Sequence, residues 1–164
     1  MLAYLQGLSL GLAYVAPIGV QNLFVINAGL SQPRAAAYRT ALIVIFFDVT
    51  LALAGFFGIG ALIEHSELIR KGVLLAGSLV VMYMGLRLML SREVAGPAIN
   101  VNIPLMKTIG MACVVTWFNP QAIIDVSLLL GSFRVALPPE ESGLFLWGVV
   151  CASCLWFLSL TTIS

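Results

Sequence analysis

The sequence predicts an all-α integral membrane protein, built as a polytopic bundle of helices. Hydrophobic residues make up 61% of the 164 residues, charged residues make up 9%, and the mean hydropathy is +1.08. Soluble domains carry roughly 25% charged residues. The apolar residues also form long runs, and a helix needs about 20 such residues to cross a bilayer. These observations exclude an ordinary soluble domain.

Five apolar segments are predicted to span the membrane. They cover roughly residues 2–30, 40–63, 68–90, 108–130 and 143–164. The first is too long for one straight helix and too long for a cleaved signal peptide, so we interpret it as a retained, broken span. Asp48 and Asp125 are the only charges in the second and fourth spans. Short polar segments between spans, such as Ser31–Arg34, are typical of turns.

The order of the spans predicts two three-helix repeats. Residues 1–90 form the first repeat, residues 91–107 a linker, and residues 108–164 a second repeat that lacks its third helix. An odd number of spans in each repeat makes the two repeats inverted, which is a common transporter design. Because the sequence stops within an apolar run, we expect five spans truncated from six, with a natural five-span protein as the alternative.

The distribution of basic residues predicts the orientation in the membrane. The first and third loops hold Arg34, Arg39, Arg87, Arg92 and Lys107, whereas the second and fourth hold Arg70, Lys71 and Arg134. Loops rich in lysine and arginine stay on the cytoplasmic side. The bias of five to three therefore places the amino terminus outside.

Two apolar spans are interrupted by helix breakers that are accompanied by amide side chains. The first interruption is the run 16–22 and the second is the run 117–121. The predicted breakers are Pro17, Gly19 and Pro120. Broken backbone is tolerated in a membrane only where it lines a cavity or is buried in protein. A matching pair of such breaks in two halves of a chain indicates the substrate site of a transporter.

The amides beside the breaks are candidate binding residues. They are Gln21, Asn22, Asn119 and Gln121. A side-chain amide both donates and accepts hydrogen bonds, so it suits the carboxylate and the ammonium of an amino acid. Helix amino ends at a break would add unpaired N–H groups for the carboxylate. The alternative is that the amides only satisfy backbone groups freed by the breaks.

Asp48 and Asp125 are candidate sites for a cation, a coupling proton, or both in turn. An ionisable residue within a span costs about 2.5–3.5 kcal/mol on insertion scales, so it normally faces a cavity or a partner. Burial favours a protonated carboxyl, whereas an arriving cation favours the carboxylate. This competition provides a route to exchange of protons for substrate. The alternative is an interhelical hydrogen bond or a position near the interface.

Other residues point to packing rather than to chemistry. Gly11, Gly19, Gly29, Gly55, Gly58 and Gly60 are expected to allow helices to approach closely. Trp117 and Trp156 either stack on a substrate or belong to an aromatic belt. The Cys151-x-x-Cys154 pair is interpreted as small packing residues, because apolar surroundings make thiols inert.

The sequence gives no sign of an enzyme. It has no nucleophile–base pair, phosphate loop or metal-ligand cluster, so neither a metal nor a cofactor is expected. A thiol oxidoreductase would need a cysteine beside the proline in each half, and the first half has no cysteine. The net charge of +1, without a lysine- or arginine-rich cluster, argues against nucleic acid as a partner.

The motifs together resemble those of the lysine exporter (LysE) family. The matching segments are Gln6–Gly11, Pro17–Val25 with Gly29, Asp48 with Gly55–Gly58, Val115–Pro120 with Asp125 and Gly131, and Ser153–Phe157. Asp125, which follows Asn119-Pro120, resembles the lysine/arginine branch. Val20 stands where the family generally has proline, so we expect a milder first break. The family usually has a sixth span.

The resemblance implies a multi-pass exporter of basic amino acids in the bacterial inner membrane, driven by the membrane potential or a proton gradient. In it, Asp48 and Asp125 would bind the cationic side chain or the coupling proton. Gln21, Asn22 and Asn119 would hold the amino acid backbone. Other amino acids or small cationic solutes remain alternative substrates. A channel subunit that works as a homo-oligomer also remains open.

Overall fold

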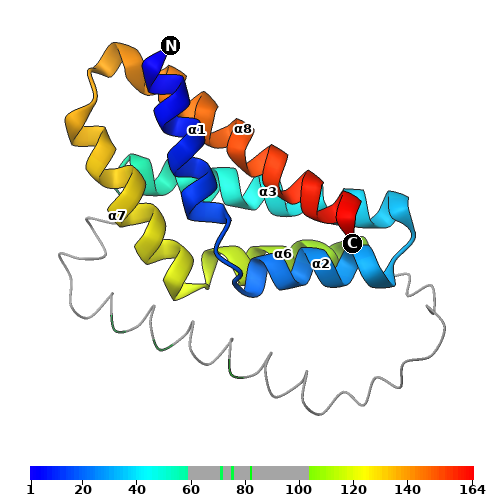
Figure 1. Cartoon of the computed structure of the whole chain (residues 1–164). Coiled ribbons are helices and arrows are strands. Elements are labelled where there is room, and N and C mark those ends of the chain that lie inside the picture. The colour runs from blue at the N-terminus through cyan, green and yellow to red at the C-terminus, as the bar shows by residue number, and fades with distance from the viewer. Residues whose placement is uncertain (59–70, 72–74, 76–81, 83–103) are drawn as a thin grey trace.

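The computed structural model describes residues 1–58, 71, 75, 82 and 104–164. The elements in these residues are helices, in agreement with the predicted all-α class (Figure 1). They are α1 (Leu2–Val15), α2 (Val20–Ser31), α3 (Arg34–Phe56), α6 (Leu105–Trp117), α7 (Pro120–Ala136) and α8 (Pro139–Ile163). Most of the predicted third span and most of the predicted linker lie outside the described residues.

Two helices of the described residues, α3 and α8, are each long and apolar enough to cross a membrane. The pairs α1–α2 and α6–α7 also meet these criteria when each pair is taken as one bent span. The described residues therefore provide two spans, or up to four. The fold is that of a polytopic helical membrane protein.

The spans begin earlier than the apolar runs predicted. The second starts at Arg34 instead of residue 40, the fourth at Leu105 instead of 108, and the fifth at Pro139 instead of 143. Each of these helices directly follows a proline, which fixes the backbone angle at the helix entry. Hydropathy marks only the apolar part of a span, whereas the helix continues through its polar first turn.

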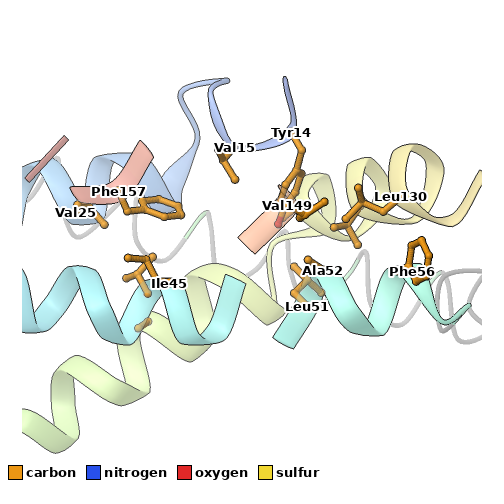
Figure 2. Packing of buried hydrophobic residues seen from close by; sticks show 14 of the residues in the cluster. Tyr14, Val15, Val25, Ile45, Leu51, Ala52, Phe56, Leu130, Val149 and Phe157 are labelled. Carbon is orange, nitrogen blue, oxygen red and sulfur yellow. The ribbon is translucent and has the colours of Figure 1, made fainter. Parts of the chain in front are cut away.

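The bundle is organised around α3, which packs against α2, α6, α7 and α8. Figure 2 shows buried side chains of the surrounding helices pointing toward Ile45, Leu51 and Ala52 of α3. At the end of α3, the Phe56 ring stacks on Phe145 of α8, with 5.6 Å between centroids. This core fixes the positions of the side chains that face α3.

Helices α1 and α8 approach so closely that their contact requires glycine. A Cβ atom at Gly7 would clash with the carbonyl oxygen of Phe145, and one at Gly148 would clash with that of Tyr4. One helix turn along, a Cβ at Gly11 would come within 2.6 Å of the Ala152 Cβ. Small residues spaced four apart thus bring the two backbones together, as in other membrane helix pairs.

The predicted packing glycines divide into three groups. Gly11, Gly29 and Gly55 do lie where a side chain would collide with a neighbouring helix or chain end. For Gly19 and Gly58 the described residues give no such contact, because a Cβ at either position would have none of their atoms within 4 Å. Gly58 instead has a φ of +95°, a backbone conformation that favours glycine after a helix end. Gly60 lies outside the described residues.

Candidate substrate site at the first helix break

The first break separates α1 from α2 at residues 16–19, and the two helices meet at an angle of 79°. Pro17 lacks the N–H that a continuing helix needs, and Gly19 is extended, with φ −117° and ψ −172°. The bend is larger than the 60° between α6 and α7.

Asn22 holds the broken backbone together. Its Nδ2 donates to the carbonyl oxygens of Val15 at 3.0 Å and Pro17 at 2.7 Å, and its side chain is only 3% exposed. Its Oδ1 accepts a hydrogen bond from Nε1 of Trp156 at 3.2 Å. The amide is thus engaged with the protein itself. This matches the alternative in which such an amide satisfies the backbone groups that the break frees.

Asp48 lies at the centre of a polar cluster and is completely buried. Oδ1 accepts hydrogen bonds from the Tyr14 hydroxyl at 2.8 Å and from Nε2 of Gln21 at 3.2 Å. Oδ2 accepts one from Oγ of Ser153 at 2.5 Å. Helices α1, α2 and α8 each supply one donor to this side chain of α3. We call these four residues the Asp48 cluster.

The Asp48 cluster combines predicted and unpredicted residues. Gln21 and Asp48 were predicted as binding residues, and the fold brings them into contact. Tyr14 and Ser153 were not predicted. The sequence offers a signal for Ser153, because it lies fifteen positions after Pro138, as Asp48 lies fifteen after Pro33. No comparable sequence signal marks Tyr14.

The second break holds the remaining candidates. Asn119 separates α6 from α7, Pro120 begins α7, and Asp125 lies half-buried about one and a half turns further on. Helix α2 packs on α6, and α1 packs on α7, so the two breaks lie in the same region of the molecule (Figure 1). The side chain of Gln121 lies outside the described part.

Hydroxyls near the second break differ from those of the Asp48 cluster. The side-chain oxygens of Thr116 and Ser127 are buried and have no hydrogen-bond partner among the described residues. By contrast, Nε1 of Trp117 donates to Oγ1 of Thr50 at 3.2 Å and ties the end of α6 to α3. Both tryptophans, Trp117 and Trp156, therefore donate to polar side chains of neighbouring helices.

The fold and the buried polar cluster define a polytopic membrane protein with a carboxylate among its spans. The sequence matches the family of LysE type translocators over residues 12–164. The chain therefore belongs to the LysE family, whose members are transporters and not enzymes.

Individual relatives cover nearly the whole chain. It is 32% identical over 165 residues to the arginine exporter protein ArgO of Serratia proteamaculans, which covers 98% of this chain and 80% of that protein. It is 31% identical over 165 residues to ArgO of Pectobacterium atrosepticum, with the same coverage. It is 32% identical over 171 residues to ArgO of Escherichia coli K12, which covers 98% of this chain and 77% of that protein. No solved structure matches the chain.

Proposed function

We propose that this chain exports cationic amino acids, arginine or lysine, across the bacterial inner membrane as a secondary transporter. The observation that carries the proposal is the carboxyl group of Asp48, fully buried in a membrane bundle beside a broken helix. A buried charge with no function is expensive to maintain, and in spans such residues mark transport pathways. The similarity to arginine exporters supports the choice of substrate.

The hydrogen bonds of Asp48 leave one lone-pair position of its carboxylate unused. A carboxylate offers roughly four lone-pair positions. Two on Oδ1 are taken by Tyr14 and Gln21, and one on Oδ2 is taken by Ser153. One position on Oδ2 remains for a proton or for the charged end of a substrate. The donors hold the carboxylate in place, so that its position is fixed before a cation arrives.

The other end of an amino acid would lie at the start of α2. The first N–H groups of a helix lack partners within it and attract carboxylates. Helix α2 has 12 residues and begins at Val20, next to Gln21 of the Asp48 cluster. Because the Asn22 amide is bonded to backbone, we assign it a positioning role and leave substrate contact to Gln21 and Asn119. Asp125 would receive the second charge, either substrate or proton.

Helix packing supports the proposal of two inverted repeats, residues 1–90 and 108–164. If α1, α2 and α3 correspond to α6, α7 and α8, each contact should recur with the repeats exchanged. The contact of α1 with α8 corresponds to that of α6 with α3. In the same way, the contact of α2 with α8 corresponds to that of α7 with α3, and the contact of α1 with α7 to that of α6 with α2. Such a frame permits alternating access around a fixed site. An outside amino terminus and a homo-oligomer are parts of the same proposal.

The test is efflux of labelled arginine from membrane vesicles that contain the chain, with a proton gradient imposed and then collapsed. We expect gradient-dependent efflux for the wild type and none for Asp48→Asn, which keeps the size of the side chain but removes the charge. Thr50→Ser, on the same helix, serves as a control for general damage. Efflux by Asp48→Asn at the wild-type rate would refute the proposed site. Conduction without counter-ion exchange would favour the channel alternative.

A further inference from the structure

Ser153 has a choice between two hydrogen-bond acceptors. Its Oγ lies 2.5 Å from Oδ2 of Asp48 on α3 and 3.3 Å from the carbonyl oxygen of Val149 on its own helix. A serine hydroxyl has one proton and can donate to only one acceptor at a time. The shorter distance and the charged acceptor favour Asp48. Both Ser153 and Asp48 are completely buried, so water does not compete.

The second acceptor makes it easy to break the bond to Asp48. When a cation occupies the remaining position on Oδ2, the carboxylate becomes a weaker acceptor for Ser153. The hydroxyl can then rotate to the Val149 carbonyl, a bond that serine commonly makes one turn back in membrane helices. No buried group is left without a partner, so the rearrangement avoids the usual cost of losing a buried hydrogen bond.

We propose that Ser153 is a positioning residue that links the occupancy of Asp48 to the attachment of α8. This inference rests on the proposed function. In the empty transporter, the Ser153–Asp48 bond holds α8 against α3. Binding at Asp48 turns Ser153 back to its own helix and frees this attachment. Trp156, one turn further along the same face of α8, bonds to Asn22 at the first break, so α8 contacts both the carboxylate and the bent backbone.

The link predicts opposite effects on apparent affinity and on rate. Without the Ser153 hydroxyl, both lone-pair positions on Oδ2 of Asp48 are open to a cation instead of one, so arginine should bind more tightly. In the empty transporter, α8 should no longer be bonded to α3 through Ser153. The return of the empty transporter to its starting conformation should therefore slow. A residue needed only for folding would lower the rate without improving affinity.

The experiment measures arginine efflux from vesicles as a function of internal arginine for Ser153→Ala, Ser153→Cys and Ser153→Thr. For Ser153→Ala we expect the half-saturating concentration to fall several-fold and the maximal rate to fall about tenfold, as for one hydrogen bond to a charged group. Ser153→Cys has a side chain of similar shape but a weak donor, so the half-saturating concentration and the maximal rate should both fall, as for Ser153→Ala. Ser153→Thr retains the hydroxyl and should restore both values.

Thr161→Val is the matched control. Thr161 is also buried on α8 and bonds one turn back, to the carbonyl of Phe157 at 2.8 Å, but it has no bond to Asp48 among the described residues. Its removal should leave both values unchanged. The inference is overturned if Ser153→Ala and Ser153→Cys behave like Thr161→Val, or if they lower the rate without lowering the half-saturating concentration. Efflux by the wild type tests the proposed function separately.

Discussion

Each of the two breaks joins two helices at a bend, but the breaks differ in how their buried polar groups are hydrogen-bonded. At the first break, the freed carbonyls of Val15 and Pro17 are bonded by Asn22, and Asp48 receives three donors. Near the second break, the hydroxyls of Thr116 and Ser127 are buried without a partner in the described residues. Buried polar atoms are normally paired, and exceptions call for an explanation.

Because of this difference, we expect the two breaks to behave differently during transport. The bonds of Asn22 to Val15 and Pro17 resist movement of the bent backbone, because any displacement of it breaks two hydrogen bonds at once. Hydroxyls that have no partner among the described residues can bond to a substrate, to water, or in another conformation. We therefore expect the first break to stay fixed as the repeats move. The second break should change its contacts during transport.

Replacement of Asp125 by asparagine is expected to have the largest effect on function. The variant should lose efflux of arginine and lysine, because the second carboxylate of the proposed site is gone, while the chain still inserts into the membrane. Labelled efflux and the amount of inserted protein are the two measurements. Efflux at the wild-type rate from Asp125→Asn would contradict the role of this residue at the second break.

Replacement of Asn22 by leucine is expected to have the largest effect on stability. The change removes the amide that bonds two carbonyls at the first break and leaves them without donors. Each buried unpaired group costs about 1–3 kcal/mol. Thermal unfolding of the purified protein in detergent should therefore show a marked loss. Asn27→Leu, at an exposed position on the same helix, should be tolerated.

Comparable losses in the two variants would contradict the role of Asn22 as the residue that holds the break. An intact protein that no longer transports after Asn22→Leu would instead favour direct contact of the amide with substrate. The pair of variants thus separates the two interpretations of amides beside helix breaks.

The sequence predicted the class and the position of the first break but not the full site. Apolar runs and prolines act locally, so they indicated helices and the interruption around Pro17. The partners of Asp48 depend on which faces of distant helices meet. Ser153 reaches Asp48 only because α8 and α3 pack together, over a separation of 105 residues. The role of Asn22 depends on the course of the bent backbone, which the amide itself does not specify.

The smallest expected effect on stability is that of removing the unpaired hydroxyls. Thr116→Val and Ser127→Ala delete groups that have no partner among the described residues, so the free energy of unfolding should be unchanged or slightly higher. Thr40→Val is the comparison, since that buried hydroxyl bonds to Gln32 and Ala36, and its loss should cost about 1 kcal/mol. If the second break bonds substrate or rearranges, arginine efflux should fall in the first two variants while their stability holds. A clear loss of stability in them would show that these hydroxyls are bonded in the folded protein, and the contrast between the breaks would not stand.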